Sequence, residues 1–187
     1  SKHLLPIYNK PMIYYPLSTL MLGGIREYLI ITNPSHLKLY QNLLGYGDNL
    51  GINIKYKIQK KPEGLPQAFI IGEKFINNEP VCLNLGDHIF FGNDVNRLLK
   101  KNINSFKKTT IFAYRHKKSN EYGVINLDKK NRPISISEKP NKPKSNLIVC
   151  GLYIYDKNVV ELSKNLKFSK RGELEISDLN NLYLKNN

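Results

Sequence analysis

The sequence of 187 residues has no tryptophan, two cysteines and two methionines. Cys82 and Cys150 lie in separate apolar segments, and no Cys/His spacing typical of a metal site occurs. We therefore expect both thiols to be reduced core groups, as is usual in a cytoplasmic protein. No apolar run approaches the roughly 18 residues that a membrane-spanning helix needs, so we expect no membrane partner.

Acidic residues are also scarce, since 15 Asp and Glu stand against 29 Lys and Arg, for a formal net charge of +14. Such an excess suits a nucleic-acid partner. The basic residues are scattered over expected loops and helix faces, however, and accompany no nucleic-acid-binding motif. We therefore expect no nucleic acid as partner and keep a basic nucleic-acid binder only as an alternative. Anionic, phosphate-bearing substrates would use the same positive field.

The order of the apolar segments predicts strands that alternate with helices. The expected strands are 27–32, 52–58, 80–85, 109–114 and 148–155, and the expected helices are 11–22, 33–44, 65–75, 94–104, 159–164 and 174–184. Pro16 should shift the start of the first helix or kink it. Segments 123–127 and 134–137 are typical of an antiparallel hairpin. The pattern predicts an α/β fold: a three-layer αβα, Rossmann-like domain with a mixed, mostly parallel sheet and a small β-rich excursion.

Residues 81–87, Val-Cys-Leu-Asn-Leu-Gly-Asp, form the segment around which the chain is organised. Its apolar part is typical of a buried strand, and Gly86 lets the backbone turn sharply. Asp87 then follows the carboxyl end of the strand, where α/β sheets bind ligands. A carboxylate there suits Mg²⁺, which proteins hold through one or two carboxylates plus substrate phosphates. From this segment alone, a turn-capping role for Asp87 is an equal alternative.

Several segments together resemble the sugar-1-phosphate nucleotidylyltransferases, and most of all the branch that makes dTDP-glucose from dTTP and glucose 1-phosphate. They are SKHLLPIYNKPMIYYPLSTLM (1–21), GLPQAFIIGE (64–73), LNLGDHIFFG (83–92), EYGVI (121–125), SEKPNKPKSN (137–146), GLYIYD (151–156) and RGELEISDLN (171–180). Each segment alone is a weak signal, but the set is specific and covers essentially the whole chain. The resemblance implies a nucleotide-binding half at about 1–115 and a sugar-phosphate-binding part at about 116–187.

The resemblance also implies roles for single residues. Lys2 and Asp87 would be catalytic, with Lys2 on the nucleotide phosphates and Asp87 as a ligand of Mg²⁺, the expected cofactor. Gln59 and Gly64 would bind the nucleotide together with Lys2. The sugar-phosphate site would consist of Tyr122, Gly123, Glu138, Lys139, Val149, Tyr153 and Arg171.

Within that sugar-phosphate site, the resemblance has Glu138 accept hydrogen bonds from sugar hydroxyls, while Lys139 and Arg171 hold the phosphate. The reaction would be an in-line displacement, in which an oxygen of the sugar phosphate attacks the α-phosphorus and pyrophosphate leaves. Each residue also has a plainer alternative. Lys2 could be a frayed terminal side chain, Gln59 a solvated strand end, residues 138–140 an exposed turn, and residues 171–173 only a helix N-terminus.

Some parts of the family pattern are not found in the sequence. The family carries a Gly-rich loop, GGxGTRL, before its Ser-Lys segment and a second Mg²⁺-binding Asp in a Trp-x-Asp-Thr-Gly-Thr segment. His3 and His88 replace the usual Gln and Asn. We therefore expect an incomplete domain, truncated and poorly active. The alternatives are a UTP-dependent or other sugar-phosphate nucleotidyltransferase and a non-catalytic sugar-nucleotide-binding remnant. The resemblance further implies a homotetramer and a place in dTDP-rhamnose biosynthesis.

Overall fold

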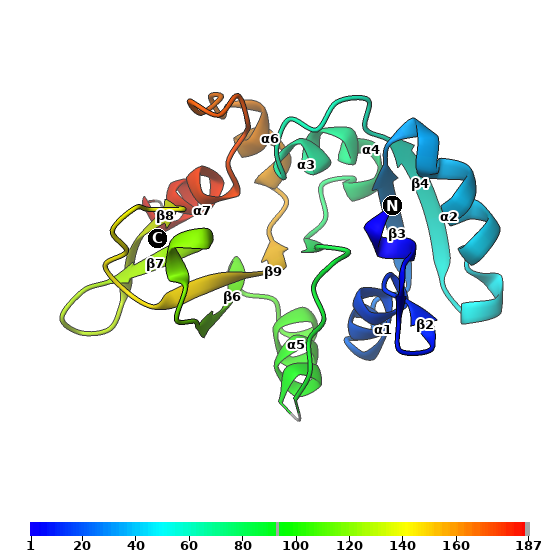
Figure 1. Ribbon diagram of the computed structural model, residues 1–187, viewed down its shortest axis with the longest axis horizontal. Coiled ribbons are helices and arrows are strands. Elements are labelled where there is room, and N and C mark those ends of the chain that lie inside the picture. The colour runs from blue at the N-terminus through cyan, green and yellow to red at the C-terminus, as the bar shows by residue number, and fades with distance from the viewer. Residues whose placement is uncertain (93, 186–187) are drawn as a thin grey trace. The chain divides into compact units, whose positions relative to one another are not determined.

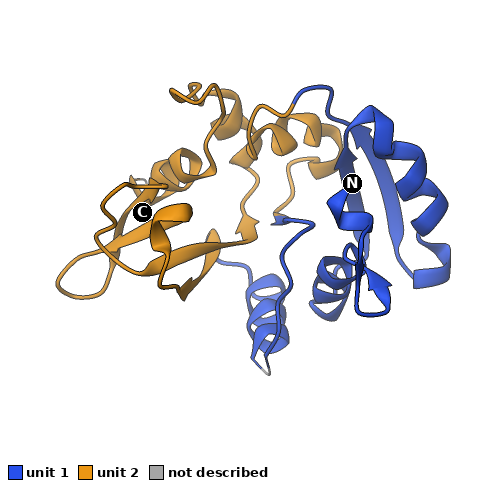
Figure 2. Ribbon diagram, in the orientation of Figure 1, with its two compact units in different colours: residues 1–61, 82–108 blue, residues 62–81, 109–187 orange. Residues whose placement is uncertain are grey.

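The computed structural model describes residues 1–92 and 94–185 (Figure 1). The chain forms two compact units, which are described separately (Figure 2). Unit 1 comprises residues 1–61 and 82–108, and unit 2 comprises residues 62–81 and the described residues from 109 onward. Neither unit is continuous in sequence. No described helix is both long and apolar enough to cross a membrane.

Unit 1 is built on a parallel strand pair, β3 (Glu27–Thr32) and β4 (Asn53–Ile58), in full register from one end to the other. Tyr28 and Ile54 face each other in this pair and are buried, as the apolar pattern predicts. The other elements are η1 (Lys2–Leu4), β1 (Pro6–Ile7), β2 (Lys10–Pro11), α1 (Tyr14–Leu22), η2 (Pro34–His36), α2 (Leu37–Leu44), η3 (Asp48–Leu50), α5 (Val95–Asn104) and β5 (Val81–Asn84), whose first residue belongs to unit 2.

Helix α1 begins at Tyr14, three residues later than the start of the expected helix 11–22. Pro16 thereby falls in the first turn, where backbone N–H groups have no partner within the helix and proline costs little. The predicted shift of the start is confirmed. The residues before it form the β1–β2 hairpin instead, with Tyr8 in a left-handed conformation (φ 59°). Strands of two residues carry no periodic signal, so the sequence did not predict this hairpin.

Close packing holds α1 to two other parts of unit 1. A side chain at Gly23 would meet the Cδ2 atom of Leu99 at 2.7 Å, so the glycine lets α5 approach the end of α1. Leu99 is fully buried as a result. The side-chain amide of Asn84, at the end of β5, donates to the carbonyl of Pro16 at 3.2 Å. These contacts fix β5, and with it the segment that leads to Asp87, against α1.

Unit 2 contains an antiparallel sheet in which β9 (Leu147–Tyr155) pairs with β6 (Thr110–Arg115) and β7 (Gly123–Leu127), and β7 pairs with β8 (Pro133–Glu138). The predicted hairpin is therefore confirmed. The remaining elements are α3 (Gln67–Ile71), α4 (Glu73–Ile76), η4 (Ser119–Glu121), α6 (Val159–Lys164) and α7 (Ile176–Lys185). One helix was expected at 65–75, but two form, because Gly72 leaves the helical conformation between them.

The core of unit 2 lies along β9, which is buried at every position after Leu147. The ring of Tyr155 meets that of Phe69 edge-on at 5.2 Å, and its hydroxyl donates to Asn180 Oδ1 at 2.6 Å. Helices and mixed strand pairing agree with the predicted α/β class. Parallel pairing is seen for β3 and β4, whereas the pairs among β6 to β9 are antiparallel. The antiparallel pairs gather in the β-rich part of unit 2, where a short connection joins β7 to β8, while β6 and β7 reach β9 across longer segments.

Candidate functional site

An ion pair in unit 1 joins the two residues that the sequence predicts to be catalytic. The ammonium group of Lys2 donates a hydrogen bond to Oδ2 of Asp87, although 85 positions separate them in the sequence. Lys2 belongs to η1, and Asp87 follows β5 after a turn at Gly86. A side chain at Gly86 would lie 3.1 Å from the ring of His3 in η1. The glycine therefore lets η1 pack against the turn that carries Asp87.

The charges around Asp87 keep its carboxyl group ionised. Burial raises the pKa of Asp87, but the hydrogen bond and positive charge of Lys2, assisted by His88, outweigh burial and bring the pKa below its ordinary value. His88 Nδ1 lies 3.2 Å from Oδ1, the oxygen that Lys2 does not bind. Lys2 itself is 62% exposed. An exposed ion pair of this kind contributes little to stability. Lys2 can therefore leave Asp87 for a more strongly charged anion at a small cost in stability.

A polar cluster beneath η1 anchors the segment that carries Lys2. His3 Nδ1 lies 3.0 Å from the hydroxyl of Tyr40 in α2, and Ser1 Oγ lies 2.8 Å from the same hydroxyl. Burial lowers the pKa of His3, which favours the neutral ring. No local signal in the sequence indicated Tyr40, because its contact with His3 spans 37 positions.

Gln59 directly follows β4, and its backbone N–H donates to the carbonyl of Thr32 at 2.8 Å. This bond extends the parallel pairing of β3 and β4 by one residue. Gln59 and Asp87 thus both follow the carboxyl ends of strands in unit 1, which is where ligands bind in open α/β sheets.

The side chains around Asp87 decide whether the expected Mg²⁺ fits there. Among residues 1–92 and 94–185, no group of three or more His, Cys, Asp and Glu side chains could hold a metal ion. A closed, protein-built metal site such as that of structural zinc is therefore not found in these residues. Mg²⁺ needs fewer protein ligands, because it keeps water ligands and also binds carboxylate and substrate phosphate oxygens. The ionised carboxylate of Asp87 fits one such ligand.

A second carboxylate, that of Glu138 at the end of β8, lies at the centre of the site residues in unit 2. Its Oε2 atom accepts a hydrogen bond from Ser177 Oγ at 2.5 Å, and Ser177, in the first turn of α7, is 2% exposed. A side chain at Gly123, which pairs with Glu138, would lie 3.2 Å from this hydroxyl. Gly123 therefore leaves room for the bond between Ser177 and Glu138.

Arg171 lies beside Glu138 among three carboxylates. Its Nη1 atom is 3.9 Å from Glu138 Oε1 and 3.5 Å from Glu175 Oε1, and its Nη2 atom is 3.5 Å from Glu173 Oε2. These distances exceed those of strong charge-assisted hydrogen bonds. The three carboxylates hold the guanidinium near Glu138 without saturating it, and its predicted contact with a phosphate stays a prediction. Ser169 Oγ donates to Glu175 Oε1 at 2.8 Å and so fixes one of the three carboxylates.

The backbone joins Tyr122 and Lys139, since the N–H of Lys139 donates to the carbonyl of Tyr122 at 3.0 Å. Lys139 has a left-handed backbone (φ 39°) immediately after Glu138. The ring of Tyr122 meets His116 edge-on at 5.3 Å. The structure thus brings Tyr122, Gly123, Glu138, Lys139 and Arg171 into one region of unit 2.

Val149 and Tyr153 lie on β9 and are buried, so their side chains pack in the core of unit 2. Burial raises the pKa of Tyr153, and the negative charge of Glu138 raises it further. Burial gives both Val149 and Tyr153 a packing role. Their predicted contacts with a sugar stay predictions.

Gly64 occupies a position in unit 2 that only glycine can take. Its φ is +103°, and a side chain there would lie 2.0 Å from the carbonyl oxygen of Leu174. The neighbouring carbonyl of Glu63 accepts the N–H of Leu174 at 2.8 Å. Close approach of two backbone segments therefore explains this glycine, and its predicted role toward a nucleotide base remains a prediction.

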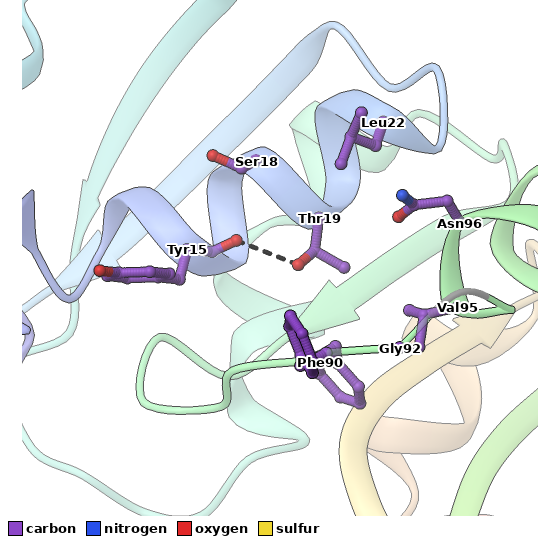
Figure 3. Close-up of a pocket in the computed structure, with 9 residues that line it drawn as sticks. Tyr15, Ser18, Thr19, Leu22, Phe90, Gly92, Val95 and Asn96 are labelled. Atoms are coloured by element: carbon purple, nitrogen blue, oxygen red, sulfur yellow. Dashed lines mark hydrogen bonds between the residues drawn. The ribbon is translucent and has the colours of Figure 1, made fainter.

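A hollow of about 280 Å³ lies in unit 1 between α1 and the segment that leads into α5 (Figure 3). The close-up shows Thr19 donating to the carbonyl of Tyr15, at 3.0 Å. The lining residues are Tyr15, Ser18, Thr19, Leu22, Phe90, Phe91, Gly92, Val95 and Asn96. None of the predicted site residues lines this hollow, so the roles of Lys2, Gln59 and Asp87 do not involve it.

Sequence reasoning missed the residues that support the site side chains. Ser177 and Glu175 lie within the segment RGELEISDLN, but only the folded chain shows that they bind Glu138 and Arg171. Asn181, one turn after Ser177, holds the backbone of β8 and carried no signal at all.

The α/β fold agrees with the class of protein that comparison with known sequences shows. The chain belongs to the nucleotidyl transferase family, whose sequence model matches residues 1–187. The predicted family resemblance is confirmed.

The similar curated proteins narrow the class further. The chain is 53% identical over 185 residues to glucose-1-phosphate thymidylyltransferase of Neisseria meningitidis serogroup A, and 45% identical over 184 residues to that of Mycolicibacterium smegmatis. The alignments cover 99% and 98% of the chain. They cover 64% of each relative, so the chain spans less than two thirds of their length.

Solved structures show the same fold. A structure from Bacillus anthracis, provisionally described as a glucose-1-phosphate thymidylyltransferase in complex with a sucrose, is 37% identical, with a TM-score of 0.89 over 99% of this chain and 74% of that one. UDP-glucose pyrophosphorylase complexed with UDP-glucose is 25% identical, with a TM-score of 0.85 over 100% of this chain and 79% of that one. These likenesses confirm the predicted α/β fold class.

Proposed function

We propose that this protein transfers a thymidylyl group from dTTP to glucose 1-phosphate and releases pyrophosphate. The observation that carries the proposal is the pairing of Lys2 with Asp87 beyond β5, which joins a phosphate-binding cation to a ligand for a hard metal ion. The choice of substrates rests on the names of the relatives that are 42–53% identical to the chain.

Lys2 and Asp87 would act on the nucleotide. The triphosphate carries more negative charge than one carboxylate, so the ammonium of Lys2 would move from Asp87 to the phosphates. That movement frees Oδ2 of Asp87 for Mg²⁺. Mg²⁺ held there would offset phosphate charge during the displacement. Lys2 would stabilise the charge that develops on the phosphates as the sugar-phosphate oxygen attacks and pyrophosphate leaves.

Glu138, Lys139 and Arg171 would bind the other substrate. Ser177 occupies Oε2 of Glu138, which leaves Oε1 to accept hydrogen bonds from sugar hydroxyls. Arg171 would turn from its three carboxylates to the phosphate, and Lys139 would add a second positive charge. A fixed cation pair contributes both charge and orientation, and orientation is a large part of catalysis in reactions between two bound substrates.

A uridylyl transferase is the second candidate, and the likeness to UDP-glucose pyrophosphorylase favours it. Thymine and uracil differ by one methyl group. A hydrophobic pocket discriminates such a difference by only about 1–3 kcal/mol. Gln59 and the turn at Gly64 would therefore bind either base, and the preference has to be measured.

The test is pyrophosphate release by the chain with Mg²⁺, glucose 1-phosphate and either dTTP or UTP. We expect release that is faster with dTTP and that Asp87→Asn abolishes. The matched control is Asp94→Asn, since Asp94 is an exposed acid of unit 1 that also pairs with a cation, Arg97, at 2.8 Å. Faster release with UTP would support the second candidate. Binding of dTDP-glucose without any release would instead indicate a non-catalytic sugar-nucleotide-binding protein.

Other features stay predictions. The family resemblance implies the division into a nucleotide-binding half and a sugar-phosphate-binding part, the homotetramer and the place in dTDP-rhamnose biosynthesis, whereas the two cysteines predict the cytoplasmic location. Size-exclusion chromatography with light scattering tests the homotetramer directly.

A further inference from the structure

Strand β8 ends the order of described strands in its sheet, and a side chain from α7 completes its open edge. Asn181 Nδ2 donates to the carbonyl of Ile136 at 2.7 Å, and Asn181 Oδ1 accepts the N–H of the same residue at 2.8 Å. One amide thus satisfies both backbone groups of Ile136. A neighbouring strand would provide the same two bonds, so Asn181 takes the place of a strand at this point.

The spacing of helix and strand links this contact to Glu138. Ser177 and Asn181 are four residues apart in α7, or about 6 Å along the helix axis. Ile136 and Glu138 are two residues apart in β8, or about 6.8 Å along the strand. Because these distances nearly match, α7 binds β8 at two successive points. Asn181 holds the backbone of Ile136, and Ser177 holds the carboxylate of Glu138.

We infer that Asn181 is a positioning residue for the sugar-phosphate site, which acts by fixing β8 so that Glu138 is presented in one orientation. The inference rests on the proposed function, because it assumes that Glu138 binds the sugar. Glu138 has three side-chain torsions, and the bond from Ser177 can restrain them only while β8 keeps its distance from α7. Without Asn181, water would satisfy Ile136 and the strand edge could move away from the helix.

The direct test is a calorimetric titration of the chain with glucose 1-phosphate and, separately, with dTTP. Asn181→Ala removes two neutral hydrogen bonds that preorganise one ligand contact. We expect this variant to bind glucose 1-phosphate about five- to tenfold more weakly. The affinity for dTTP should stay unchanged, because Lys2, Asp87 and Gln59 are held by other contacts. Equal affinity for glucose 1-phosphate before and after the substitution would overturn the inference.

Asn126→Ala is the matched control. Asn126 Nδ2 donates to Ser135 Oγ and to Ser137 Oγ, each at 3.0 Å, so this variant also removes two amide contacts with β8. Side chains alternate along a strand, and the two serines therefore lie on the face opposite to Glu138. We expect Asn126→Ala to keep its affinity for glucose 1-phosphate. Near-UV circular dichroism checks that both variants stay folded.

A double substitution separates positioning from a general loss of stability. If Asn181 acts through Glu138, then Asn181→Ala should have no further effect on glucose 1-phosphate binding once Glu138→Gln is present. Additive losses would contradict the inference. The proposed function fails in a different way, namely if the unmodified chain does not bind glucose 1-phosphate or if Glu138→Gln binds it equally well.

Discussion

The two units hold their candidate site residues in different ways. In unit 1, Lys2 and Asp87 form an exposed ion pair, and the lysine reaches Asp87 across 85 positions of sequence. In unit 2, the carboxylate of Glu138 is bound by a buried serine and lies at the end of a strand that α7 holds by its backbone. The ion pair of unit 1 is thus exposed and can part at little cost in stability, whereas contacts from α7 hold Glu138 in unit 2.

The difference follows from the proposed chemistry of each substrate. A triphosphate with its metal ion brings several charges, and charges can displace an exposed ion pair at little cost. A sugar offers neutral hydroxyls, whose hydrogen bonds are directional and worth only about 0.5–1.5 kcal/mol each. A hydroxyl-binding carboxylate therefore gains most from being oriented in advance.

Removing the charge of Lys2 should give the largest effect. We expect Lys2→Met to lower kcat/KM for pyrophosphate release about 10²–10³-fold, because the charge acts on the transition state. Lys10→Met is the control, since Lys10 is an exposed lysine of unit 1 whose ammonium group donates to Asn9 Oδ1 at 3.3 Å. An equal loss of kcat/KM in both variants would mean that the positive charge of unit 1 matters as a whole. It would contradict a specific role for Lys2.

A methyl group at Gly64 should strongly destabilise unit 2. Gly64→Ala combines a left-handed backbone with a clash against the Leu174 carbonyl, and we expect a loss of about 2–5 kcal/mol in the free energy of unfolding. Gly24→Ala in unit 1 is the matched control, because Gly24 has φ +97° but nothing lies within 4 Å of an added Cβ. It should cost about 1 kcal/mol. Urea unfolding measures the free energy of unfolding of both variants. Losses of similar size would contradict the close packing around Gly64.

Removal of the serine hydroxyl should weaken the sugar side of the proposed site. We expect Ser177→Ala to raise KM for glucose 1-phosphate about tenfold and to leave KM for dTTP unchanged, because Glu138 loses a charge-assisted hydrogen bond. Ser177→Thr keeps a hydroxyl and should restore most of the affinity. A serine variant that raises both KM values alike would argue for a structural role alone.

The smallest effect concerns pH and the ion pair of unit 1. The folded pKa of Asp87 is lowered, so its contribution to stability is complete above the ordinary pKa of about 3.9 and is lost as pH falls through the folded pKa. The difference in unfolding free energy between the unmodified chain and Asp87→Asn should be constant from pH 7 to 5 and shrink below pH 4. Urea titrations measure it, and a difference that grows in acid would contradict the account.

Much of the fold was predictable because local patterns decide it. The apolar run at 27–32 forms β3 with the predicted ends, and the hairpin at 123–127 and 134–137 forms as expected. The break at Gly72 and the strands around Tyr8 were not predictable, since one glycine or two extended residues give no periodic signal.

Apart from Asp87, the site residues were predicted only through the family resemblance, and their roles stay predictions. Nothing in the local sequence of Lys2 indicates that it meets Asp87, because the contact depends on how η1 packs against the turn at Gly86. Supporting residues such as Ser177 and Asn181 were missed for the same reason. They act on β8 from a helix about 40 residues further along the chain, and short polar side chains in a helix are usually solvated.

The most direct test of the contrast between the units follows the carboxyl carbons of Asp87 and Glu138 by ¹³C nuclear magnetic resonance. Mg²⁺ and dTTP are added first, and glucose 1-phosphate afterwards. We expect the signal of Asp87 to shift with the nucleotide, as Lys2 leaves it, and the signal of Glu138 to stay in place until the sugar phosphate is added. A shift of Glu138 on addition of nucleotide, or an Asp87 signal that does not respond to it, would contradict the proposed contrast between the two units.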